Sequence, residues 1–174
     1  GLDTMYGDKC EKWIKFANSL KMRLLNRISN ADPSAWGKIQ EMVNNPADYP
    51  VFESVEDQAV IPYSGVDPYQ SYFSTGNITP DNFKNYKLSE EVVNMMYDPE
   101  KKYADPRLSI FGLKSGKADW KGTVPGSADS DLPVVDKDAT HLNTNTLNRN
   151  NAPSRLLEYS EILFIYAEGV QKGK

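Results

Sequence analysis

The chain has 174 residues with 20 Lys and Arg against 24 Asp and Glu, and its net charge of −4 comes with no acidic or basic half. This balance excludes the basic surface that a nucleic-acid-binding protein needs. One cysteine, Cys10, and one histidine, His141, exclude an internal disulfide and a Cys/His metal cluster, and no apolar stretch reaches the roughly 18 residues of a membrane-spanning helix.

Residues 12–28, KWIKFANSLKMRLLNRI, have the hydrophobic period of an amphipathic helix, which we place at about residues 8–29. The apolar arc of this helix includes Trp13, Leu24 and Ile28 and spans about 180°, whereas a helix lying on one core needs a stripe of only about 100°. The width of the arc predicts a helix packed between neighbours on two sides, with Trp13 in the core.

Two shorter helices are predicted from their capping residues. Asp32 can cap a helix over residues 33–44 that begins with Pro33, and the short link to the preceding helix favours an antiparallel pair. Ser89 can cap a second helix over residues 89–97, which has glutamates in its first turn.

The last predicted helix covers residues 154–172, with Ser154 as its cap. It is apolar nearly all round, and such a helix is normally buried on all sides. Burial on all sides requires segments that the rest of this chain does not supply. If those segments are missing, Phe164 and Ile165 are expected to be exposed or covered by a partner chain.

Long irregular stretches, residues 46–80 and 105–153, separate these helices. The sequence therefore predicts a mainly α fold with long irregular loops, either as a single domain over residues 1–174 or as a fragment of a larger domain. Because the chain starts without Met and ends directly after an apolar segment, we expect a processed or truncated piece of a longer protein.

Both end helices carry a resemblance to a known family. YGDKCEKWIKFANSLKMRLLNRIS resembles a segment typical of the SusD/RagB-like outer-membrane lipoproteins of Bacteroidota, and YSEILFIYAEGVQKG is similar to a later helix of that family. YADPRLSIFGL and WKGTVPG are similar to segments that lie between the two. The resemblance implies tetratricopeptide-like helix pairs, an α–α superhelix, decorated by long loops.

The resemblance also implies a function. Members of this family capture glycans or other oligomeric nutrients at the external face of the outer membrane, as partners of a TonB-dependent, SusC-like transporter. Cys10 lies inside the first predicted helix and is not expected to carry a lipid. Membrane contact is therefore expected only through a lipid anchor absent from this chain.

Aromatic and amide side chains of the long loops are the candidate ligand-binding residues. A pyranose stacks its C–H face on a flat ring, and its hydroxyls need amide or carboxylate partners. For each ring the alternative is that it fixes a loop onto the helical body. The candidate residues are Tyr63, Tyr69, Tyr72, Phe73, Trp120 and Asn145, with Asn148 and Asn150 as further amides.

No catalytic site is expected. Glycoside hydrolysis needs two carboxyl groups about 5–9.5 Å apart. Glu158, Glu161 and Glu168 share one face of the last predicted helix, but a polar stripe, or pairing with Arg or Lys of neighbouring helices, accounts for them better. His141 has no G-x-S-x-G nucleophile turn to serve.

No metal or other cofactor is expected either. The segment DSDLPVVDKD has spaced aspartates but lacks the glycine and the terminal glutamate of a calcium-binding loop. The alternative function that the sequence leaves open is a helical-repeat scaffold that binds other proteins and has no glycan site. The aspartates of this segment are Asp129, Asp131, Asp136 and Asp138.

Overall fold

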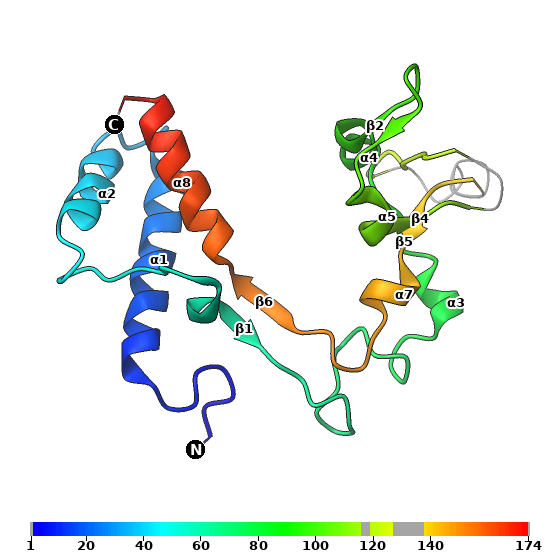
Figure 1. The fold of residues 1–174 in the computed structure, drawn as a ribbon, viewed down its shortest axis with the longest axis horizontal. Helices are drawn as coiled ribbons and strands as arrows, with labels where there is room; N and C mark the ends of the chain where they lie inside the picture. Colours follow the sequence, from blue (N-terminus) through cyan, green and yellow to red (C-terminus); the bar gives the residue numbers. More distant parts are fainter. Residues whose placement is uncertain (1, 116–118, 127–137, 174) are drawn as a thin grey trace. The chain divides into compact units, whose positions relative to one another are not determined.

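The computed structural model describes residues 2–115, 119–126 and 138–173. The chain is mainly α-helical, and it divides into two compact units. The helical unit is Gly1–Pro62 together with Pro153–Lys174, and the loop unit is Tyr63–Ala152 (Figure 1). None of the helices in the described ranges is long and apolar enough to cross a bilayer.

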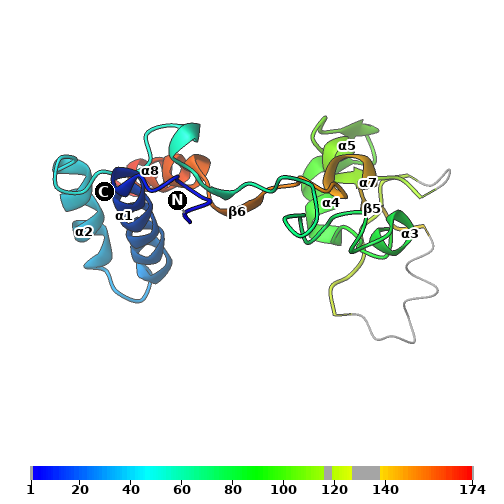
Figure 2. The ribbon, with the colours of Figure 1, turned by 90° about the horizontal axis from the view of Figure 1, so that it is seen from below.

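Three helices and one two-stranded ribbon form the helical unit. The first two helices form the predicted pair, and both α2 and α8 pack against α1 (Figure 2). The prediction that Asp32 caps the second helix and Pro33 begins it is wrong, because the Asp32 carboxylate binds Ser34 and α2 begins only at Ala35. In the ribbon, β1 and β6 are antiparallel, with Ile61 opposite Ser154. The elements are α1 (Cys10–Ile28), α2 (Ala35–Asn44), the 3-10 turn η1 (Val55–Asp57), β1 (Ala59–Ile61), β6 (Ser154–Leu157) and α8 (Tyr159–Gln171).

The core of the helical unit lies between the three helices. Met22 of α1 and Ile162 of α8 are fully buried, and Trp36 of α2 is 6% exposed. Each such side chain contributes about 1.5–3 kcal/mol through burial. The buried cluster comprises Tyr6, Met22, Leu25, Ala35, Trp36, Ile39, Met42, Phe52, Ala59, Leu157, Ile162 and Ile165.

The prediction that Trp13 lies in the core is wrong, because the side of α1 that packs within the described chain lies away from Trp13 and buries Ser19, Met22 and Leu25. Trp13, Leu24 and Ile28, in the middle of the apolar arc, are 42%, 56% and 47% exposed. On the opposite side, Ser19 is fully buried and its Oγ accepts a hydrogen bond from the Phe52 N–H at 2.9 Å.

Ion pairs and amide hydrogen bonds hold the same side of α1. Arg23 Nη2 lies 2.7 Å from Glu161 Oε1, and Lys15 Nζ lies 2.9 Å from Asp57 Oδ2. The Asn18 amide donates to a backbone carbonyl at 3.0 Å. Specific polar partners therefore bind this face, and the described residues leave the centre of the apolar arc exposed.

The last helix begins later than predicted. Residues 154–157 form the strand β6, in which Leu157 is fully buried opposite Ala59. The helix cap is Glu158, which exchanges hydrogen bonds with Glu161 in a capping box, so the prediction of Ser154 as the cap is wrong. A capping box satisfies two helix-end N–H groups, whereas a lone serine satisfies one.

The exposure of α8 agrees only partly with the prediction from its sequence. Phe164 is 73% exposed, as the sequence predicts, whereas Ile165 is 5% exposed and belongs to the core, so the prediction for Ile165 is wrong. One face of α8 therefore packs on α1 and α2, and the described chain does not cover the other.

Short elements make up the loop unit. Its predicted helix over residues 89–97 is confirmed as α4, where Ser89 Oγ accepts from the Val92 N–H at 3.4 Å. Leu88, Val93 and Leu108 form a small apolar cluster. The elements are α3 (Pro80–Phe83), α4 (Glu90–Met96), β2 (Tyr97–Asp98) paired with β3 (Tyr103–Ala104), α5 (Leu108–Phe111), β4 (Gly112–Leu113) paired with β5 (His141–Leu142), and α7 (Thr144–Leu147).

A close backbone approach fixes the segment WKGTVPG beside α4. The Glu90 N–H donates to the Thr123 carbonyl and the Thr123 N–H donates to the Leu88 carbonyl, both at 2.9 Å. A Cβ at Gly122 would lie 2.4 Å from the Cα and N of Glu90. Only glycine fits at this position, because a methyl group would displace backbone atoms.

Candidate functional site

Four aromatic rings of the loop unit contact one another, and we call them the ring cluster: Tyr72, Phe73, Phe83 and Tyr86. The Phe73 ring centroid lies 5.1 Å from Tyr72, 5.8 Å from Phe83 and 6.3 Å from Tyr86, with the ring planes 81–90° apart. Edge-to-face pairs of this kind are each worth about 0.5–1.5 kcal/mol beyond burial. Phe73 is thus the centre of an ordered aromatic group.

The ring cluster is anchored at one member and open at the others. Phe83, at the end of α3, is 1% exposed, whereas Tyr72, Phe73 and Tyr86 are 66%, 40% and 42% exposed. Exposed rings that contact one another form a contiguous apolar patch, and such patches can mark a site for a partner or a ligand. The cluster therefore offers an aromatic surface on a fixed base.

Sequence reasoning identified Tyr72 and Phe73 but missed Phe83 and Tyr86. The available signal was the three-residue spacing of the two missed rings after a Thr79-Pro80 helix start, which places both on one side of a short turn. Thr79 Oγ1 caps this turn by accepting from the Asn82 N–H at 3.3 Å.

The other two tyrosines predicted to bind ligand lie at the start of the loop unit. Tyr69 is 71% exposed, and its backbone closes a short loop through Gly65 N–H to Tyr69 carbonyl and Tyr69 N–H to Val66 carbonyl, at 3.3 and 2.8 Å. Tyr63 is half-buried. Neither ring is among the ring contacts of the ring cluster.

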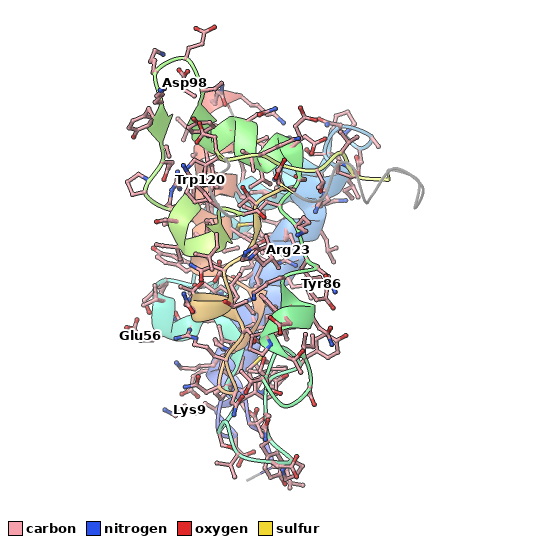
Figure 3. All side chains as sticks on the ribbon, turned by 90° about the vertical axis from the view of Figure 1, so that its right-hand side faces the viewer. Lys9, Arg23, Glu56, Tyr86, Asp98 and Trp120 are labelled. Carbon is pink, nitrogen blue, oxygen red and sulfur yellow. The ribbon has the colours of Figure 1, made fainter. Side chains whose placement is uncertain are left out.

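Trp120 lies in a different part of the loop unit. It is half-buried against the cluster of Leu88, Val93 and Leu108, and Lys114 Nζ lies 5.2 Å from its ring centroid. Figure 3 labels Trp120 and Tyr86 at separate places. The structure therefore does not bring Trp120 into the ring cluster.

The candidate amides have different environments. Asn145 is exposed on α7, and its backbone N–H donates to Asn143 Oδ1 at 2.9 Å. Asn148 is 5% exposed and Asn150 is half-buried, and both bind the backbone of the loop that carries Tyr72 and Phe73. Asn148 and Asn150 therefore hold the backbone of the loop whose rings form the aromatic surface.

Glu158, Glu161 and Glu168 each pair with a basic residue, but only Glu161 pairs with one from a neighbouring helix, as the sequence predicts. Glu161 pairs with Arg23, Glu158 with Arg155 at 2.6 Å, and Glu168 with Lys172 at 2.6 Å. The hydrogen bond from Lys172 lowers the pKa of Glu168. A general acid for glycoside hydrolysis needs a raised pKa, so Glu168 does not have the chemistry of one.

No group of three His, Cys, Asp or Glu side chains with the geometry of a metal site occurs within residues 2–115, 119–126 and 138–173. Of the spaced aspartates that the sequence singles out, Asp129, Asp131 and Asp136 lie outside the described residues, and Asp138 is exposed.

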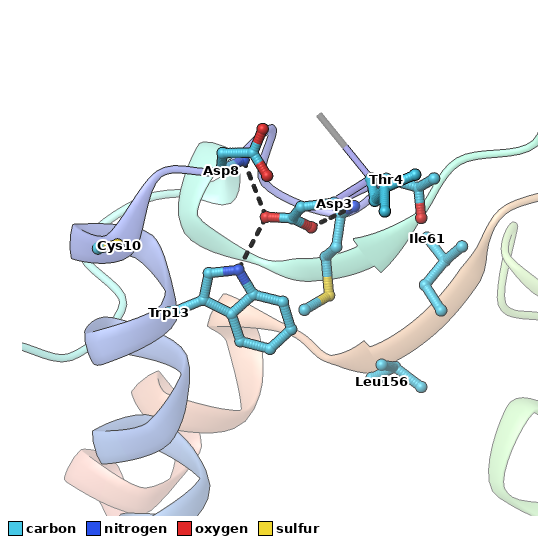
Figure 4. A pocket seen from close by; sticks show the side chains of 9 residues that line it. Asp3, Thr4, Asp8, Cys10, Trp13, Ile61 and Leu156 are labelled. Carbon is cyan, nitrogen blue, oxygen red and sulfur yellow. Dashed lines mark hydrogen bonds between the residues drawn. The ribbon is translucent and has the colours of Figure 1, made fainter.

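A pocket lies in the helical unit, at the start of α1. This pocket of about 550 Å³ is lined by apolar residues including Leu2, Ile61 and Leu156, and by Trp13 (Figure 4). The indole Nε1–H of Trp13 donates to Asp3 Oδ2 at 2.8 Å.

Asp3 holds together, by hydrogen bonds, the turn of residues 3–8 that lines one side of this pocket. Besides the indole, its carboxylate accepts from the N–H groups of Met5, Tyr6 and Asp8 at 2.9–3.1 Å. The hydrogen bond from Trp13, together with those from the backbone, lowers the pKa of Asp3 to about 2. Its hydrogen-bonding capacity is therefore used within the protein, and the pocket offers a ligand mainly apolar surface.

Comparison with solved structures shows the fold. A chitin-binding protein matches with a TM-score of 0.70 and 22% identity, over 98% of this chain and 38% of its own length. A SusD homologue from Bacteroides fragilis matches with a TM-score of 0.74 and 19% identity, over 98% and 38%. A Bacteroidetes SusD-like protein matches with a TM-score of 0.67 and 19% identity, over 98% and 45%.

The chain therefore spans about two fifths of the length of these solved structures. A search of curated proteins found no match. The profile of the SusD-like family described as starch-binding and associating with the outer membrane matches residues 1–174. The predicted resemblance is confirmed, and the chain belongs to this SusD-like family.

Proposed function

We propose that the chain binds glycans, or other oligomeric nutrients, noncovalently through the ring cluster of the loop unit. The observation that carries this proposal is the set of three exposed rings in which Tyr72 and Tyr86 both contact Phe73, while Phe73 and Tyr86 rest against the buried Phe83. The C–H face of a pyranose can stack on such rings, and tyrosine hydroxyls can bond to sugar hydroxyls. The proposal includes no catalytic step.

The comparisons support this choice of ligand. The family is described as starch-binding, and one structure with the same fold is a chitin-binding protein. The chain would act at the external face of the outer membrane and pass its ligand to a TonB-dependent, SusC-like transporter. This location agrees with a family described as associating with the outer membrane.

Other predicted residues extend the proposed site. Tyr69 is the most exposed ring of the loop unit close in sequence to the ring cluster, and exposed Asn145 can offer an amide to sugar hydroxyls. Tyr63 and Trp120 are half-buried and would contact only a ligand that reaches beyond the cluster.

The helical unit serves as the scaffold in this proposal. The pair α1 and α2 would be one tetratricopeptide-like helix pair of a larger SusD-like domain, in which further helices continue the superhelix. The exposed apolar arc of α1 supports this view, because Trp13, Leu24 and Ile28 lie along one side of the helix at the spacing that a second helix requires.

The same arc favours a second candidate function, a helical-repeat scaffold that binds only other proteins. Exposed apolar stripes on helices are common protein-interaction surfaces. The two candidates differ in where the ligand-binding residues lie: in the loop unit for glycan binding, and on α1 for a protein scaffold.

Calorimetric titration with maltoheptaose and chitohexaose distinguishes these candidates. Tyr86→Ala is expected to weaken binding at least ten-fold, about 1.4 kcal/mol, because it removes one stacking surface. Tyr103→Ala removes another exposed tyrosine of the same unit, on β3, and should leave the affinity unchanged. No binding of either oligosaccharide, together with tight binding to the transporter, would instead support the protein scaffold.

A further inference from the structure

The loop of residues 71–78, which carries Tyr72 and Phe73, has a polar interior. Ser71 and Ser74 are 3% and 0% exposed, while the two rings next to them are exposed. The N–H groups of Ser74 and Ile78 donate to the Ser71 and Ser74 carbonyls, both at 2.9 Å. Hydrogen bonds therefore hold the backbone of this loop, while its Phe73 ring also packs against the buried Phe83.

Asn148, at the end of α7, makes two of the contacts that hold the loop. Its Nδ2 donates to the Phe73 carbonyl at 2.8 Å and to the Ile78 carbonyl at 3.0 Å. These two bonds fix the orientation of the amide, because the opposite orientation would place Oδ1 against two acceptors. With a side chain 5% exposed overall, Asn148 joins both ends of the segment 73–78.

Asn150 makes a second set of contacts with the same loop. Its Oδ1 accepts from the Thr75 N–H at 3.1 Å and from Thr75 Oγ1 at 2.9 Å. Its backbone carbonyl accepts from the Ser71 N–H at 2.8 Å. Asn148 and Asn150 together hold the loop at its start, middle and end.

We propose that Asn148 and Asn150 are positioning residues that hold the 71–78 loop in its ligand-ready form, so that Tyr72 and Phe73 meet a glycan without first becoming ordered. This inference rests on the proposed function, and it assigns these two amides to the support of the rings instead of to sugar contacts. A preorganised surface binds more tightly, because the entropy cost of ordering the loop does not reduce the free energy of binding.

Asn148→Asp is the sharpest test, because it keeps the shape of the side chain and replaces its donor with an acceptor facing two carbonyls. Amide hydrogen exchange should become at least ten-fold faster at Ser74 and Ile78 while it stays unchanged at Val93, in the apolar cluster of the same unit. The affinity for maltoheptaose or chitohexaose should fall at least ten-fold. Asn94→Asp, the same change at an exposed site on α4, should alter neither quantity.

Two results would overturn the proposal: unchanged exchange at Ser74 and Ile78, or faster exchange with unchanged glycan affinity. If Val93 also loses protection in Asn148→Asp, the milder Asn150→Ala replaces it, with the same expectations for exchange and affinity. If the unmodified chain binds neither oligosaccharide, the proposed function fails, and the exchange result alone decides whether the two amides hold the loop.

Discussion

The helical unit and the loop unit differ in what they bury and what they expose. The helical unit buries large apolar side chains such as Trp36 and Ile162 and exposes an apolar stripe along α1. The loop unit has a small apolar cluster, buries polar side chains such as Ser74 and Asn148, and exposes the contacting rings of the ring cluster. A stripe along a helix suits another helix, whereas rings on a hydrogen-bonded loop suit a small flat ligand.

The largest expected effect comes from the core of the helical unit. Ile162→Ala removes a fully buried side chain and should lower the free energy of unfolding by about 2–5 kcal/mol, because it leaves a cavity. Leu163→Ala is the matched control. Leu163 is the next residue of α8 and is 47% exposed, so its replacement should lower the free energy of unfolding far less. Urea unfolding followed by circular dichroism measures both. Equal losses would contradict the assignment of Ile162 to the core.

In the loop unit, the stability should depend more on the close contact between the backbones of Gly122 and Glu90 than on the volume of buried apolar side chains. Gly122→Ala is expected to destabilise this unit by about 1–3 kcal/mol, because the new methyl group meets the backbone of Glu90. Gly37→Ala, on an exposed face of α2 with open space around it, should instead stabilise the chain by about 0.5–1 kcal/mol. Opposite signs in thermal unfolding would support the comparison, and equal signs would contradict it.

Trp13 of α1 and Trp36 of α2 test whether the Trp13 side of α1 is as well covered as the core of the helical unit. Trp36→Ala should lower the free energy of unfolding by about 3–5 kcal/mol, because this ring is buried. Trp13→Ala should lower it by only about 1–2 kcal/mol in this chain, because the ring is 42% exposed and the change removes edge-on ring contacts and one hydrogen bond, to Asp3. A Trp13→Ala loss as large as that of Trp36→Ala, measured by urea unfolding, would show that its side of α1 is covered.

The smallest expected effect is the pH dependence of the Asp3 turn. The pKa of Asp3 is about 2 in the folded chain against an ordinary value of 3.8, so its hydrogen bonds add stability above about pH 4. That contribution is lost as the pH falls towards 2. Tryptophan fluorescence should show a transition near pH 2 that Asp3→Asn abolishes; an unchanged transition in the variant would assign it to another group.

Periodicity and capping chemistry predicted the parts of the fold that depend on local sequence. The hydrophobic period located α1, the Asp32-Pro33 signal located α2 to within two residues of its start, and Ser89 located the start of α4. The prediction that Ser154 caps the last helix was wrong, because residues 154–157 form a strand that pairs with β1. The partner strand is about 100 residues away in the sequence, so the local sequence around Ser154 does not reveal the pairing.

Burial depended on partners that the sequence does not reveal. The apolar arc of α1 predicted neighbours on two sides, but the described segments pack against the opposite side, through Met22 in the core and through polar residues such as Ser19 and Arg23. In the loop unit, Asn148 has the residue type of a sugar ligand, and only its two carbonyl partners reveal its supporting position. Residue type alone could not separate these roles, because an amide bonds equally well to a loop and to a sugar.

The central claim is that ligand binding resides in the loop unit, and amide shift mapping by NMR during titration with maltoheptaose and chitohexaose tests it most directly. We predict shifts for residues 71–78 and 83–86, with α1 unchanged. Shifts confined to the helical unit around Trp13, with residues 71–86 silent, would contradict it.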